Sequence, residues 1–133
     1  MLRYAPLAGR LIFAAMFAMA LSFKLMGFGD IAQYIAAAGF PAPIVLAVLA
    51  ALLEAGLVLG FLIGAFFTET ALIAAVYVVF LGFAFHGPSH WSKNPDEFGF
   101  FTDHFTFLAG LLFAAAHGPG DVLALNRFKL INC

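Results

Sequence analysis

From Ile31 to Thr68 the chain carries one charged residue, Glu54. A stretch this long and apolar can cross a bilayer, because a membrane helix needs about 20 predominantly apolar residues. The whole chain has the same character: hydrophobic residues make up 65% of it and charged residues 10%, against roughly 45–50% and about 25% in soluble domains. The sequence therefore predicts an integral membrane protein.

Four apolar segments, separated by glycine, proline or polar residues, predict four membrane helices. Spans of about 20 residues each leave little of the chain for a separate soluble domain. A short amphipathic segment at about 31–38 predicts an interfacial helix, which the GFPAP run after it ends. We expect an all-α fold with one transmembrane domain over residues 1–133: a four-transmembrane-helix bundle with a short interfacial helix between helices 1 and 2, its membrane helices covering about 6–26, 43–67, 68–86 and 98–117.

The second and third predicted helices follow each other almost without a linker. Thr68 is a residue type that caps helix N-termini, and Glu69 in the first turn would complement the helix dipole. A turn this short makes the two helices antiparallel neighbours.

Positive charges predict the orientation, because Lys and Arg are more frequent in cytoplasmic loops. An even number of spans places both termini on one side, and that side carries more of the positive charges, so both termini are predicted to be cytoplasmic. Tyr34 and Trp91 then fit the outer aromatic belt. The cations on the terminal side are Arg3, Arg10, Arg127 and Lys129, and those on the other side are Lys24 and Lys93.

Several classes of function are disfavoured by what the chain contains. Nucleic acid is bound by positively charged surfaces, and a chain with a net charge of −1 is not expected to attract it. Cys133 is the only cysteine, so an internal disulfide or a thiolate cluster cannot form. The histidines lie near the predicted membrane boundaries, not as a haem-ligand pair at matching depth, and we expect no tightly bound redox cofactor.

Glu54 is the leading functional candidate, because a carboxylate inside the membrane costs several kcal/mol unless it is paired. Lys24 and Arg10 are its two candidate partners, since a nearby cation favours the charged carboxylate. Either cation could instead extend to the interface along its aliphatic stem. Glu54 itself could alternatively be a neutral, hydrogen-bonded acid that joins helices.

A second polar cluster is expected at the outer ends of the last two helices. Its imidazoles and carboxylate are ligand types that suit a transition metal, but Gly87 and Pro88 interrupt the helical spacing, and no metal site is predicted. The alternatives are a quinone or proton-relay role at the interface and ordinary hydrogen-bonded loop ends. The cluster comprises His86, His90, Asp103 and His104.

Gly56, Gly60 and Gly64 recur every four residues along the second predicted helix. Small residues at this spacing let a neighbouring helix backbone approach closely. We expect them to form a helix-packing face.

Several short motifs, taken in order, resemble the DoxX family of small four-helix bacterial membrane proteins. They are Arg10-Leu11, Lys24-Leu25, GFPAP at 39–43, Glu54 with its following glycines, and GPG at 118–120. The resemblance implies a protein of the bacterial inner (cytoplasmic) membrane. It also implies an association with quinone-linked oxidases and with thiol or quinone stress.

The leading hypothesis is an accessory subunit of a membrane oxidoreductase or electron-transfer assembly that contacts quinone. In it, Glu54, assisted by Lys24 or Arg10, offers a proton or a hydrogen bond to the quinone head group. One alternative is a purely structural subunit packed in a larger membrane complex or homo-oligomer. Another is a small proton-coupled exporter, in which the glutamate exchanges a proton for a lipophilic cation.

Overall fold

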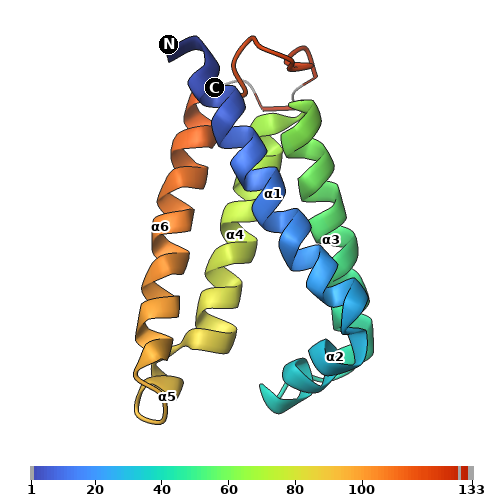
Figure 1. Cartoon of the computed structure of the whole chain (residues 1–133), viewed down its shortest axis with the longest axis vertical. Coiled ribbons are helices and arrows are strands. Elements are labelled where there is room, and N and C mark those ends of the chain that lie inside the picture. Colours follow the sequence, from blue (N-terminus) through green and yellow to red (C-terminus); the bar gives the residue numbers. More distant parts are fainter. Residues whose placement is uncertain (1, 129, 132–133) are drawn as a thin grey trace.

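The computed structural model describes residues 2–128 and 130–131, so Lys129 and Cys133 lie outside the described residues. Its main elements are four long helices that run along the long axis of the molecule (Figure 1). Each is long and apolar enough to cross a membrane, and within the described residues there is no strand. The all-α four-helix membrane bundle is confirmed. The helices are α1 (Ala5–Met26), α3 (Pro43–Ile63), α4 (Phe67–His86) and α6 (Asp96–His117).

Shorter helices occupy the two ends of the bundle. The interfacial helix is α2 (Phe28–Ala37), which begins three residues before the predicted start and is separated from α1 by Gly27 alone. The segment between α4 and α6 contains one further short helix, α5 (Pro88–Trp91), which the sequence did not predict. Figure 1 places α2 and α5 at one end of the bundle and the two chain termini at the other.

The turn between α3 and α4 differs from the prediction. The second membrane helix was expected to reach residue 67, but α3 ends at Ile63 because Gly64 takes a left-handed conformation with φ of 70°, which glycine adopts at no steric cost. The N-cap of α4 is Phe66, not Thr68. The Thr68 hydroxyl instead donates to the carbonyl of Ala115 on α6, at 3.2 Å.

Packing divides the bundle into two helix pairs, α1 with α3 and α4 with α6. Aromatic rings fill the space between them in the half nearest the termini, where Phe61 is fully buried. Its ring centroid lies 5.2 Å from that of Phe13 and 5.9 Å from that of Phe17. Alanines of α4 complete this core, so the terminal half is closely packed, whereas α1–α3 and α4–α6 separate towards α2 (Figure 1).

The three glycines of α3 have different surroundings. A Cβ on Gly60 would overlap the side chain of Thr70, so this glycine lets α3 and α4 approach closely. A Cβ on Gly64 would overlap the guanidinium of Arg10, whereas one on Gly56 would meet nothing within 4 Å. Gly60 is thus the position at which the expected small-residue contact between membrane helices is found.

Candidate functional site

Glu54 forms an ion pair with Lys24. The Lys24 ammonium, in the last turn of α1, lies 2.8 Å from Oε1 of Glu54 in the middle of α3. The glutamate side chain is 1% exposed and the lysine side chain 14%. A buried carboxylate is tolerated when a charged partner donates to it, so the pair explains how a charge is held within α3.

Tyr77 is the second partner of the same carboxylate. Its hydroxyl donates to Oε1 of Glu54 at 2.9 Å, which brings α4 into the network. The sequence interpretation missed this residue. The available signal was its position, since Tyr77 is the one residue with a polar side-chain group between Thr70 and His86 and so lies in the middle of an apolar helix, away from the aromatic belts.

Arg10 does not reach Glu54. Its side chain is buried, at 1% exposure, and Nη2 donates to the carbonyl of Leu123 at 2.9 Å. The guanidinium lies against Gly64, ten residues along α3 from Glu54, which is about 15 Å of helix. Arg10 therefore connects α1 to the C-terminal segment and to the end of α3. Of the two candidate cations, Lys24 is the one that pairs with Glu54.

An apolar cavity of about 740 Å³ lies on the α2 side of this network. Its volume falls within the range of about 300–1,000 Å³ that ligand pockets occupy. Lys24 and Tyr77 belong to its wall, whereas Glu54 stands behind them and does not line it. Apolar residues form most of the wall: Ile31, Ile35, Phe40, Pro41, Ala42, Val45, Leu46, Leu49, Ala50, Leu53, Phe80, Leu81 and Phe85.

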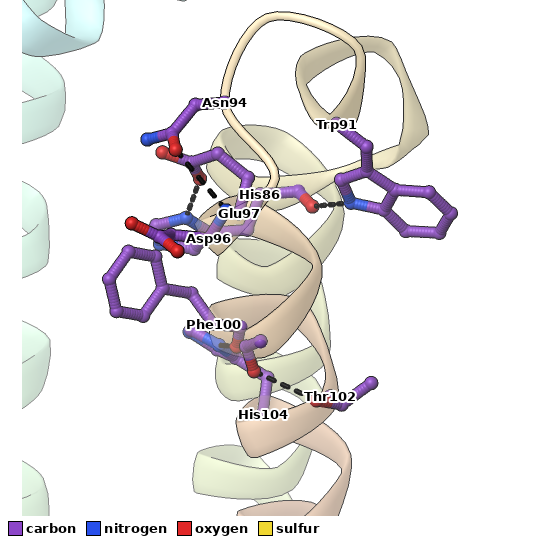
Figure 2. Close-up of polar contacts among 9 residues, drawn as sticks. His86, Trp91, Asn94, Asp96, Glu97, Phe100, Thr102 and His104 are labelled. Atoms are coloured by element: carbon purple, nitrogen blue, oxygen red, sulfur yellow. Dashed lines mark hydrogen bonds and ion pairs between the residues drawn. The ribbon is translucent and has the colours of Figure 1, made fainter.

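Two of the four residues of the predicted polar cluster, His86 and His104, line the same cavity. Their ring centroids are 5.2 Å apart. Nδ1 of His86 lies 2.5 Å from Oε2 of Glu97, and Nδ1 of His104 donates to the carbonyl of Phe100 at 2.7 Å. In Figure 2 these groups lie on one side of the α4–α6 pair, and Trp91 lies on the other.

The other two residues of the predicted cluster are not part of this arrangement. Asp103 is exposed on α6, and His90 belongs to the short helix α5. Across residues 2–128 and 130–131, no three His, Cys, Asp or Glu side chains lie close enough together to hold a metal ion. The cluster therefore divides into two residues that line the cavity and two that do not.

Tyr34 of α2 also lines the cavity. Its ring stacks on Phe85 of α4, with centroids 5.0 Å apart and planes 15° from parallel. Partial burial raises the pKa of the Tyr34 hydroxyl, and the carboxylate of Glu97 raises it further. The hydroxyl is therefore in its neutral form at the outer edge of the cavity, where it can both donate and accept a hydrogen bond.

Comparisons with known proteins agree with this architecture. The family model described as DoxX matches residues 5–87, which include Lys24, Glu54 and Tyr77. Inner membrane protein YphA of Escherichia coli (strain K12) is 30% identical over 108 residues, which cover 78% of this chain and 75% of the relative. No solved structure gives a significant match. With a family match over more than half of its length and four helices long and apolar enough to cross a membrane, this chain belongs to the DoxX family.

Proposed function

We propose that this protein binds the head group of a lipophilic quinone in the apolar cavity and serves as a quinone-contacting accessory subunit of an inner-membrane electron-transfer assembly. The observation that supports this most strongly is the position of Lys24 and Tyr77. Both belong to the wall of the cavity, and both are held by Glu54 from behind. The location in the inner membrane follows that of the relative YphA.

The chemistry of the cavity fits a quinone in two respects. A quinone has an apolar ring and tail, which match a wall made mostly of aliphatic and aromatic side chains. Its carbonyl oxygens only accept hydrogen bonds, and the Lys24 ammonium only donates them. Pockets of this kind are typically apolar with a few fixed polar groups that orient the ligand.

Glu54 has an indirect role in this proposal. It does not line the cavity, so it fixes the direction of Lys24 and Tyr77 through its contacts with them and does not itself contact the ring. This revises the sequence-based hypothesis, in which Glu54 itself offered the proton or hydrogen bond. Electron transfer is assigned to a partner oxidoreductase, as the family resemblance implies, and this chain supplies binding and orientation.

The chain offers an internal probe for a binding test. Trp91 is its only tryptophan, and its indole donates to the carbonyl of His86, a residue of the cavity wall. A short-chain ubiquinone titrated into purified protein in detergent should quench this fluorescence saturably. Lys24→Met and Tyr77→Phe should each weaken the apparent affinity by about tenfold, because each removes a group that contacts or orients the head group.

Matched controls are available for both substitutions. Lys93→Met alters an exposed loop lysine, and Tyr4→Phe alters an exposed tyrosine at the opposite end of the bundle. Neither should change the titration. Quenching that is linear and unsaturable in the wild-type protein, or equal in Lys24→Met and Lys93→Met, would contradict a quinone site in this cavity.

Extraction from the native membrane tests the accessory role. Gentle solubilisation should recover the protein with an oxidoreductase and a near-stoichiometric quinone, and the quinone should be lost in Glu54→Gln. Recovery in a large complex that holds no quinone, and that Glu54→Gln leaves unchanged, would instead favour a structural subunit.

A further inference from the structure

The geometry points to His104 as the second polar contact of the ligand, one that accepts a hydrogen bond from a hydroxyl and so makes the cavity select the reduced, quinol form over the quinone. This inference rests on the proposed function, since it assigns a redox form to the ligand of the same cavity. It adds a residue on α6 to a site otherwise formed by α1, α2, α3 and α4.

His104 stands apart from Lys24 and Tyr77 along the cavity. Its side chain packs over Gly82 of α4, where a Cβ would lie 3.1 Å from the Cβ of His104. Gly82 follows Tyr77 by five residues, which is about 7.5 Å along the helix axis. A six-membered ring with oxygens at opposite corners has dimensions of this order, so a ring with one oxygen at the level of Tyr77 can bring the other to the level of His104. Lys24, Tyr77 and His104 all line the cavity.

The hydrogen bond that His104 makes to its own helix determines whether its other ring nitrogen, Nε2, donates or accepts a hydrogen bond. The carbonyl of Phe100 can only accept, so the imidazole nitrogen 2.7 Å from it, Nδ1, carries a hydrogen. In a neutral imidazole with a protonated Nδ1, Nε2 has a free lone pair and acts as an acceptor. His104 and Lys24 both line the cavity, so the neutral imidazole offers an acceptor to a ligand there and the lysine ammonium offers a donor.

This pairing distinguishes the two redox forms of the ligand. Lys24 can donate to an oxygen of either form. Nε2 of His104 can accept only from a hydroxyl, which the quinol has and the quinone lacks. The quinone would bring a carbonyl oxygen against a lone pair and gain nothing there. The quinol therefore makes one hydrogen bond more than the quinone in the same pose.

Paired titrations of the same ring in its two redox forms test this inference. A short-chain ubiquinone and its quinol, the latter kept reduced under anaerobic conditions, are compared on the whole protein at mildly alkaline pH. The quinone is followed by Trp91 quenching and the quinol by its displacement of bound quinone. The wild-type protein should bind the quinol more tightly. His104→Phe, which keeps a ring over Gly82, should weaken quinol binding about fivefold to tenfold, the effect of one hydrogen bond, and change quinone binding less than twofold.

His117 provides a matched control on the same helix. Its Nδ1 makes the same type of bond to the carbonyl four residues earlier, Phe113, at 2.9 Å, but it does not line this cavity. His117→Phe should leave both affinities unchanged. The dimethyl ether of the quinol extends the test without any substitution, because it keeps the ring and lacks the hydroxyl hydrogens. It should bind the wild-type protein no more tightly than it binds His104→Phe.

The outcomes separate the two proposals. If neither redox form binds saturably to the wild-type protein, the quinone site itself is wrong. If the quinone binds as proposed but His104→Phe weakens both forms equally or neither, the role of His104 is wrong and the site stands. Selective loss of quinol affinity in His104→Phe, with quinone binding retained as evidence of a folded cavity, supports the inference.

Discussion

The ammonium of Lys24 lies 2.8 Å from Oε1 of Glu54, and this contact joins the last turn of α1 to the middle of α3. The two charges compensate each other at a depth where neither is well solvated. Removing one partner of such a pair leaves the other buried and uncompensated, which is more costly than removing both. The Lys24–Glu54 ion pair can therefore be tested by the free energy of unfolding as well as by ligand binding.

Lys24→Met should lower the free energy of unfolding by about 3–5 kcal/mol, the range found when one partner of a buried ion pair is removed. The double substitution Lys24→Met, Glu54→Gln should recover a large part of that loss, because no buried charge remains. Thermal unfolding of the purified protein in one detergent measures both. Additive effects of the two single substitutions would show that the charges do not interact.

Tyr77→Phe should be less destabilising than Lys24→Met. It deletes one hydroxyl that donates to a charged group, an interaction of about 1.5–3 kcal/mol, and keeps the ring between α3 and α4. The same unfolding assay measures it, with Tyr4→Phe as the exposed control. A loss as large as that of Lys24→Met would indicate that the hydroxyl has a role beyond its bond to Glu54.

Arg10→Leu should release the segment after α6 without changing ligand binding. The guanidinium holds the carbonyl of Leu123, about 15 Å along α3 from the level of Glu54. Limited proteolysis should cut the 121–128 segment faster in the variant, while the quinone titration stays at its wild-type value. Lys93→Leu, which alters an exposed lysine in the loop before α6, is the control. Weaker quinone binding in Arg10→Leu would argue that this residue acts on the cavity after all.

Gly60→Ala and Gly56→Ala form a matched pair on one helix. The new methyl group at residue 60 would overlap Thr70 and force α3 and α4 apart, which should cost about 1–3 kcal/mol. At residue 56 it would meet nothing within 4 Å, and alanine should be neutral or stabilising by up to about 1 kcal/mol. Thermal unfolding compares the two directly. Equal effects would contradict a close α3–α4 contact at Gly60.

Local patterns predicted the helices and the leading polar residue, because both depend on which side chains a membrane tolerates. Long apolar runs give the four spans, and the isolation of Glu54 marks it as a residue that needs a partner. The choice between Lys24 and Arg10 was not predictable in this way. It depends on the depth at which α1 crosses α3, and that is set by packing between residues distant in sequence.

The remaining differences have the same origin. Thr68 is a good capping residue, but the turn is decided by Gly64, whose left-handed backbone ends α3 early. Tyr77 was not predicted, because tyrosine is common at membrane interfaces and its bond to Glu54 depends on how α4 packs against α3. His86 and His104 separate from His90 and Asp103 because only the first two lie on the faces of α4 and α6 that border the cavity.

The hydrogen bond from Tyr77 to Glu54 crosses from one helix pair of the bundle to the other. The cavity lies along the same seam, with α2 and α3 on one side and α4 on the other. A bulky ligand that enters by widening this seam must strain the bond that closes it. Occupancy of the cavity is therefore coupled to the spacing between the two helix pairs. A protein that packed on the outside of either pair could respond to that spacing without touching the ligand.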